Sequence, residues 1–235
     1  MISVVTFKWR KPGYRTVFSS AHVNTLYSMV RRNYPHPFRF ICITDDAEGL
    51  APEVEAVPMW DDFMDLDNPT FPGVGPNCYP RLRVFSKDFK KIAGKRFVCL
   101  DLDAVITGDL TPLWHRPEDF VIYECGRNGH YNGSMFLMTA GCRSQVWDTF
   151  DPLTSPQIAN EAGCKGSDQG WIWYTLGKGE AVWTANDGVY AYRSDLRDGA
   201  RMLPPDARIV FFWGMPKPWD AKAQMRSRWI KEHYR

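Results

Sequence analysis

The chain has 235 residues, of which 44% are hydrophobic and 24% are charged. This composition is typical of a folded globular domain and excludes a disordered chain, and the length allows a core that needs no disulfides or structural metal ions. Lys and Arg number 29 and Asp and Glu 27, so the formal net charge is only +2. Such a balance argues against a general nucleic-acid-binding protein, whose affinity comes from neutralising many phosphates.

The cysteines and the hydropathy pattern bear on the compartment. The six cysteines show neither a CxxC pair nor a spacing typical of metal ligands. Cys42 and Cys99 lie within apolar runs, where a thiol packs as a small hydrophobic group, so we expect free thiols and a reducing compartment. The first apolar run ends at Lys8, too soon for a secretory leader, and no stretch approaches the ~20 apolar residues of a membrane span. We therefore expect a soluble, cytoplasmic protein.

The first fifty residues predict a strand, a helix and a second strand. Residues 2–7 are apolar and β-branched, which is typical of a strand, and Pro12-Gly13 after them predicts a loop. Apolar residues recur at near-helical spacing over 17–30, and a Pro-rich stretch stops this helix before the apolar strand 38–44. A strand, a helix and a strand joined by short connections form a βαβ unit, so we expect the two strands to be parallel.

The rest of the chain continues this alternation. Residues 61–80 are rich in Pro and Gly and predict a long loop, and apolar residues over 82–92 predict a helix that ends at Gly94. Further strands are expected over 96–100, 120–123, 134–139, 181–184 and 207–212, and a helix over 167–176. We expect one α/β domain over 1–216, with a mostly parallel central sheet and flanking helices, followed by a basic, aromatic tail over 217–235.

The strongest local indication of chemistry is Asp101-Leu102-Asp103, directly after the apolar strand 96–100. Side chains two residues apart on an extended chain point the same way, so the two carboxylates share a face. Close, ionised carboxylates need a cation, and hard oxygen ligands suit Mg²⁺ or Mn²⁺, which also bridge substrate phosphates. In open α/β sheets ligands collect at the carboxyl ends of strands. An alternative interpretation is that the two Asp residues cap the turn that follows.

Three later segments add to this indication. The residues Tyr131-Asn132-Gly133-Ser134 predict a turn before an apolar strand, and Gly166-Ser167-Asp168-Gln169-Gly170 places an Asp at the start of a helix. The stretch FWGMPKPW, over 212–219, is a Pro-rich loop that presents a single lysine, Lys217. Taken one at a time, these segments are a turn, a helix cap and a surface loop.

Together and in this order, the motifs resemble glycosyltransferase family 8, the glycogenin-like retaining enzymes with a GT-A fold. The likeness covers nearly the whole chain, and the FxGxxKPW ending over 212–219 is its most specific part. The resemblance implies a metal-dependent glycosyltransferase that moves a sugar from a nucleotide-sugar donor, a UDP-sugar, with retention. The acceptor is a glycan, a lipid-linked molecule or a protein, which the sequence does not identify, and no nucleic acid is expected as a partner.

The resemblance also assigns roles to individual residues. Asp101 and Asp103 hold Mn²⁺ or Mg²⁺ against the donor diphosphate, while Gly214 and Lys217 close over that diphosphate. Asp168 is the candidate for stabilising the sugar cation. The residues that line the donor sugar are Asn132, Asp168 and Gln169, and the further donor-binding residues are Thr6, Lys8, Tyr14 (stacked on uracil), Arg81 and Leu102.

The sequence departs from the family pattern at two places. The third protein ligand of the metal is usually a His at the position of Phe211, whose ring cannot ligate. The family's Asn-Ser-Gly order reads Asn132-Gly133-Ser134 here. Two carboxylates, phosphate oxygens and water then remain as ligands, which Mg²⁺ or Mn²⁺ accepts at a lower metal affinity.

Several alternatives stay open at this stage. A haloacid-dehalogenase-type phosphatase also carries DxD after an apolar strand, but on its first core strand and with a later strand that ends in paired acids, which this sequence lacks. A catalytically impaired, glycan-binding protein would explain Phe211. The tail 217–235 is either a solvated helix face or a basic, aromatic surface for peripheral contact with the inner face of a membrane. His130, two residues before Asn132, is the one candidate for an acceptor-side base.

Overall fold

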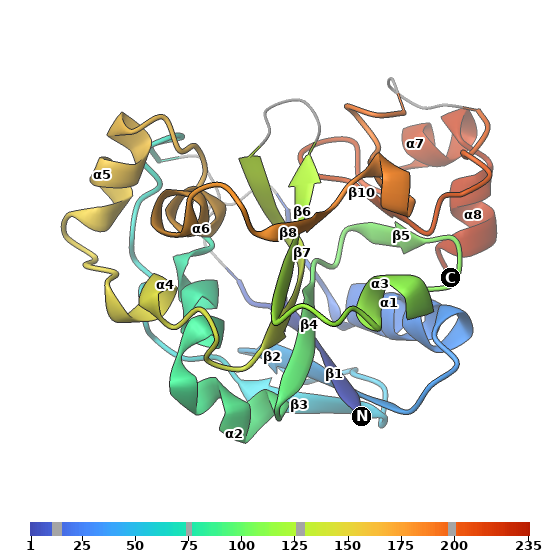
Figure 1. Cartoon of the computed structure of the whole chain (residues 1–235). Helices are drawn as coiled ribbons and strands as arrows, with labels where there is room; N and C mark the ends of the chain where they lie inside the picture. The colour runs from blue at the N-terminus through green and yellow to red at the C-terminus, as the bar shows by residue number, and fades with distance from the viewer. Residues whose placement is uncertain (11–15, 74–76, 126–129, 197–200) are drawn as a thin grey trace.

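Figure 1 shows the computed structural model, which describes residues 1–10, 16–73, 77–125, 130–196 and 201–235. A seven-stranded sheet has the order β3-β2-β1-β4-β7-β6-β8, and a three-stranded sheet has the order β5-β10-β9. The strands of the large sheet are β1 (Ile2–Lys8), β2 (Phe38–Thr44), β3 (Val54–Pro58), β4 (Arg96–Leu100), β6 (Phe120–Cys125), β7 (His130–Thr139) and β8 (Ala181–Trp183). Those of the small sheet are β5 (Ala104–Ile106), β9 (Val189–Ala191) and β10 (Ile209–Phe211).

The predicted βαβ unit is confirmed. β1 pairs in parallel with β2, from Ile2 opposite Phe38 to Lys8 opposite Thr44, and β4 pairs in parallel on the other side of β1. All seven residues of β1 are buried, as expected for a central strand covered on both faces, and apolar residues accordingly fall on both faces of the strand. β7 runs antiparallel to both β4 and β6. The expected α/β domain with a mostly parallel central sheet and flanking helices is therefore confirmed.

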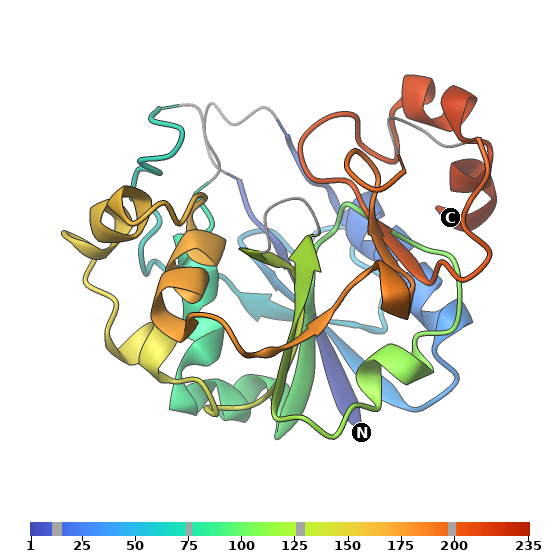
Figure 2. The same ribbon diagram turned by 45° about the horizontal axis from the view of Figure 1, so that its top comes forward.

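Helices cover both faces of the large sheet (Figures 1 and 2). On β4, Val98 and Leu100 belong to one apolar cluster, while Phe97 and Cys99 belong to the other, because successive side chains of a strand point to opposite faces. The first cluster contains the small sheet with α1 (Ser20–Asn33), α3 (Thr111–Trp114), α7 (Ala221–Arg226) and α8 (Trp229–His233). The second contains the 3-10 helices η1 (Tyr79–Phe85) and η2 (Lys87–Phe89) with α2 (Lys90–Ala93), α4 (Gln145–Asp148), α5 (Ser155–Glu161) and α6 (Asp168–Leu176).

The segment before β4 differs from the prediction. The prediction of a single helix over 82–92 is wrong, because η1 and η2 are 3-10 helices and only α2 is α-helical. Ser86 between η1 and η2 is extended, with ψ of 147°. In η1, side chains three residues apart share one face, and Tyr79, Leu82 and Phe85 are accordingly all buried. The predicted end at Gly94 is confirmed, with φ of 77° in the left-handed region.

One further expectation needs correction. The turn expected over 131–134 lies inside β7, which begins at His130, and the pairing with β6 shifts register between Ile122 and Tyr123. The tail 217–235 packs on the domain through α7 and α8, where Trp229 and Ile230 are buried. All six cysteines are free, as expected. Among the described helices, none has the length and apolar character needed to cross a membrane.

We expect Gly188→Ala to lower the free energy of unfolding by about 2–3 kcal/mol. Gly188 ends η3 (Ala185–Asp187) with φ of 78°, and a Cβ there would lie 2.3 Å from the carbonyl oxygen of Asp206. The matched control is Gly163→Ala, since Gly163 has φ of 81° but no heavy atom within 4 Å of its Cβ position. Urea denaturation measures both variants. Equal losses would contradict the backbone overlap as the cause.

Candidate active site

A cleft of about 490 Å³ opens at the carboxyl ends of β1 and β4. The start of β7 reaches the same edge because β7 is antiparallel to β4, with Leu100 opposite Met135. The loop after β10, with Trp213, Gly214 and Lys217, forms another wall of the cleft. The described lining consists of Phe7, Trp9, Thr16, Phe18, Asn68, Phe71, Asn77, Cys78, Arg81, Asp101, Leu102, Asp103, Asn132, Gly133, Ser134, Gly166, Ser167, Asp168, Gln169, Arg193, Trp213, Gly214 and Lys217.

Arg81 joins three elements at the base of the cleft. Its Nη1 donates a hydrogen bond to Oδ1 of Asp101 at 2.9 Å, and its Nη2 donates to the carbonyl oxygen of Gly133. Its Nε lies 3.4 Å from Oδ2 of Asp168. Arg81 and Asp168 are buried, whereas the side chain of Asp101 is 29% exposed. One guanidinium from η1 therefore fixes an acid at the end of β4 and another at the start of α6.

Lys217 forms a second buried ion pair. Its Nζ donates to Oδ2 of Asp103 and, at 3.1 Å, to the carbonyl oxygen of Phe212. The backbone N–H of Lys217 donates to Oδ2 of Asp220 at 2.7 Å, which holds the loop that carries the lysine. Phe212 N–H in turn donates to the carbonyl oxygen of Asp103 at 2.9 Å. The FxGxxKPW loop is thus tied by backbone and side chain to the second acid of the DxD motif.

Burial and ion pairing act on these groups in opposite directions. Burial alone would lower the pKa of the Arg81 guanidinium, but the carboxylates of Asp101 and Asp168 raise it well above its ordinary value. Burial raises the pKa of the Asp168 carboxyl, which Arg81 opposes. Burial also raises the pKa of the Asp103 carboxyl, which the Lys217 ammonium opposes. Asp103 and Asp168 therefore depend on a cationic neighbour to stay ionised.

A thiol nucleophile does not fit this cleft. Burial raises the pKa of the Cys78 thiol to about 12 and that of the neighbouring Cys99 thiol to about 12. Both are therefore protonated at neutral pH, and the thiolate is the nucleophilic form. The groups of the described lining that carry charge at neutral pH are its carboxylates and its Arg and Lys side chains.

The GSDQG segment folds tightly so that α6 starts at the cleft. Asp168 is the first residue of α6, and its Oδ2 makes no hydrogen bond within the described ranges although Arg81 Nε lies near it. A Cβ on Gly170 would lie 2.7 Å from the carbonyl oxygen of Cys164, and Gly166 has φ of 103°. The two glycines are thus required by a close approach and by a positive φ, and they leave an acid with an unused acceptor at the cleft wall.

The structure brings most of the predicted site residues together. Those that line the cleft are Arg81, Asp101, Leu102, Asp103, Asn132, Asp168, Gln169, Gly214 and Lys217. Thr6 and Lys8 are buried in β1 and are not among the lining residues, and Lys8 lies 3.9 Å from Asp46. His130 does not line the cleft either, and its ring packs against Trp173. Tyr14 lies outside the described residues.

Sequence reasoning did not single out several residues of the lining. Trp9 follows β1, Phe71 lies in the predicted long loop, and Trp213 lies inside the FxGxxKPW motif. Each is therefore next to a segment that the sequence had already associated with the site or with a functional loop. Arg193 had no such indication, because it lies in a stretch without a motif, two residues after β9.

The donor set for a divalent cation is incomplete in the protein alone. Arg81 contacts Oδ1 of Asp101 and Lys217 contacts Oδ2 of Asp103, so the other oxygen of each carboxylate takes no part in these two ion pairs. Phe211 is fully buried, with its ring 5.2 Å from that of Tyr123. The described residues contain no group of three or more His, Cys, Asp or Glu that could hold a metal. The two acids fit a cation whose other ligands come from a bound diphosphate and water.

Comparison with known proteins bears on the fold. No protein-family model and no curated protein matches the sequence. Among solved structures, the galactosyltransferase LgtC in complex with donor and acceptor sugar analogues superposes with a TM-score of 0.62 at 14% identity, covering 100% of this chain and 97% of that one. An active-site mutant of LgtC superposes with a TM-score of 0.63 at 13% identity, covering 98% of this chain and 94% of that one. The glycosyltransferase GlyE of Streptococcus pneumoniae TIGR4 superposes with a TM-score of 0.57 at 14% identity, covering 94% of this chain and 57% of that one. The chain has the fold of these glycosyltransferases.

Proposed function

We propose that this protein transfers a sugar from a UDP-sugar donor to an acceptor. The observation that carries the proposal is the pair of acids after β4. Asp101 forms an ion pair with Arg81 and Asp103 forms one with Lys217, and Asp168 lines the same cleft. The same fold in LgtC was solved with donor and acceptor sugar analogues. Retention of configuration rests on the motifs shared with family 8. The phosphatase alternative is not favoured, because the fold is that of glycosyltransferases.

The cleft has groups suited to both partial charges of the reaction. Breaking the anomeric bond leaves positive charge on the sugar ring and negative charge on the departing diphosphate. The ammonium of Lys217 is fixed between Asp103 and the Phe212 carbonyl, where it can stabilise negative charge without reorganising. The unused Oδ2 of Asp168 can accept a hydrogen bond from a sugar hydroxyl or stabilise the positive sugar. Asn132 and Gln169 lie in the same lining and are assigned to the sugar.

Mn²⁺ or Mg²⁺ is proposed at Asp101 and Asp103. Such an ion, when bound, neutralises the diphosphate and makes it a better leaving group. The part of this chain is to supply one free oxygen from each carboxylate, while Arg81 and Lys217 hold the two acids in place. Since the protein supplies two ligands, metal affinity should depend on the nucleotide.

Aromatic residues of the cleft lining are candidates for contact with the base or the acceptor. The aromatic side chains of Trp9, Phe18 and Phe71 line the cleft and offer flat faces for a uracil ring or a sugar. The acceptor is a glycan, a lipid-linked molecule or a protein. Peripheral membrane contact through the tail remains a prediction, for which Met225, 70% exposed on α7, is the apolar group to test.

Thermal denaturation tests the donor and the metal together. We expect UDP with Mn²⁺, at a hundred times the Kd, to raise the Tm by about 5–10 °C. Mn²⁺ alone should raise it by less than about 1 °C, because the protein provides only two ligands. Release of UDP from a panel of UDP-sugars then identifies the donor. If no nucleotide raises the Tm with or without Mn²⁺, or if the protein hydrolyses p-nitrophenyl phosphate instead, the proposal is wrong.

A further inference from the structure

The charged residues of the cleft divide into paired and unpaired groups. The described lining holds three cations, Arg81, Arg193 and Lys217, and three acids, Asp101, Asp103 and Asp168. Arg81 lies against Asp101 and Asp168, and Lys217 against Asp103. Arg193 is exposed, and no acid of the described ranges lies within 4.0 Å of it. It is therefore the cleft cation whose charge is not already used by the protein.

The pairing of β9 with β10 places Arg193 at the wall of the cleft. β9 and β10 are parallel with Ala191 opposite Phe211, and Tyr192 N–H donates to the Phe211 carbonyl at 2.9 Å. Continuing both chains by two residues sets Arg193 beside Trp213, and the guanidinium lies 5.4 Å from the centre of the Trp213 ring. The alternation of side chains sends Tyr192 and Phe212 into the core instead, where their rings stack at 4.3 Å.

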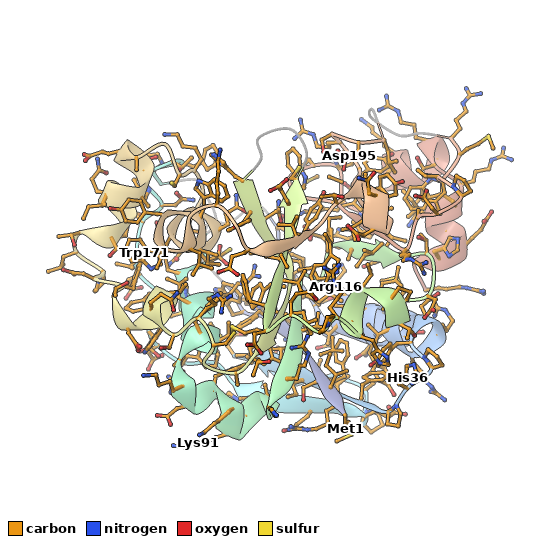
Figure 3. All side chains as sticks on the ribbon, viewed as in Figure 1. Met1, His36, Lys91, Arg116, Trp171 and Asp195 are labelled. Carbon is orange, nitrogen blue, oxygen red and sulfur yellow. The ribbon has the colours of Figure 1, made fainter. Side chains whose placement is uncertain are left out.

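The turn after β9 is fixed by its own acid. Oδ2 of Asp195 accepts a hydrogen bond from Ala191 N–H at 2.7 Å, and Asp195 N–H donates back to the Ala191 carbonyl at 2.9 Å. Asp195 is thus engaged with backbone rather than with Arg193. Figure 3 shows Asp195 in the upper part of the view, while Lys91 and His36 lie in its lower part. The indole face of Trp213 and this rigid turn together restrict the guanidinium before any ligand binds.

We infer that Arg193 is a binding residue for the diphosphate of the donor, an inference that rests on the proposed function. A guanidinium offers paired N–H donors that match phosphate oxygens, and it is less strongly hydrated than an ammonium. Within the described lining, Arg81 and Lys217 already face acids, so a diphosphate anion gains most from Arg193, which has no described acid against it. The need is greater here because the buried ring of Phe211 supplies no ligand to the proposed metal. Arg193 supplies positive charge at the wall formed by β9 and β10.

Isothermal titration calorimetry of the full chain in Mn²⁺ tests the inference with three probes: UDP, inorganic pyrophosphate and uridine. Arg193→Gln should raise the Kd for UDP and for pyrophosphate at least about tenfold and leave that for uridine unchanged. Arg193→Lys should recover part of the loss. The matched control is Arg31→Gln, because Arg31 is exposed near the end of α1 and does not line the cleft. Since Arg193 is exposed, its variants should keep the Tm of the parent.

The outcomes separate the two proposals. If Arg193→Gln binds UDP and pyrophosphate as tightly as the parent, or loses uridine affinity to the same extent as UDP affinity, the assignment of Arg193 to the diphosphate is wrong. If the parent binds pyrophosphate in an Arg193-dependent way but binds neither UDP nor UDP-sugars, the anion site stands and the proposed function is wrong.

Discussion

Replacing Lys217 with methionine is expected to lower the free energy of unfolding by about 3–5 kcal/mol and to abolish sugar transfer. The lysine is 6% exposed at its side chain and its partner Asp103 is 9% exposed, so the substitution leaves a carboxylate buried without a cation. Burial already raises the pKa of that carboxyl, and the opposing effect of Lys217 would be gone. Urea denaturation measures the loss, and UDP release from the UDP-sugar measures the activity.

A double-mutant cycle separates the ion pair from the lysine stem. Asp103→Asn in the Lys217→Met background removes the unpaired charge, so the double variant should be more stable than Lys217→Met alone, with a coupling of about 1.5 kcal/mol or more. Activity should stay lost in the double variant, because the cation at the diphosphate is still missing. Lys222→Met on the exposed face of α7 is the control. Equal stability of the Lys217→Met and Lys222→Met variants would contradict a structural ion pair.

The central sheet was predictable because its determinants are local. The apolar runs over 2–7 and 38–44 with a helix between them dictate two parallel strands, and the apolar run over 96–100 forms a third strand beside the first. These rules place Asp101 at a sheet edge without any knowledge of the rest of the chain. The start of α6 at Asp168 was predictable for the same reason, since Ser and Asp after Gly are typical of a helix start.

The missed elements depend on distant partners. β5 and β9 are three residues each, and they exist because β10 pairs with both of them. The reach of β7 back to His130 depends on its pairing with β6 across a register shift. The 3-10 helix η1 forms because it buries side chains three residues apart, which an α-helical pattern search reads as a helix.

Most of the residues predicted for the site line one cleft, but the contacts between them were not predicted. The motifs identified the acids and Lys217, yet the contact of Lys217 with Asp103 joins positions 114 residues apart. Arg81 meets Asp168 in the same way, from η1 to α6. Thr6 was assigned by resemblance alone, and its place in β1, fully buried, does not bring it to the cleft lining. Arg193 follows from the pairing of β9 with β10, which no local pattern contains.

Asp168→Asn is expected to lower the rate of UDP release from the UDP-sugar by about 10²–10³-fold while the Kd for UDP changes by less than about threefold. The reason is the position of Oδ2 of Asp168, which is buried and accepts no hydrogen bond from the described residues. Arg81 Nε lies 3.4 Å from this oxygen without donating a hydrogen bond to it, so the oxygen can still accept one from a sugar hydroxyl or face a developing positive charge. Nucleotide alone brings neither, since both belong to the sugar.

The asparagine variant should stay folded, because Arg81 keeps its hydrogen bonds to Asp101 and to the Gly133 carbonyl. Glu161→Gln on the exposed side of α5 is the control for removal of a carboxylate, and it should change neither the rate nor the Kd. A parallel loss of UDP affinity and rate in Asp168→Asn would place this acid at the nucleotide rather than the sugar. An unchanged rate would remove Asp168 from the mechanism and leave it only as an ion-pair partner of Arg81.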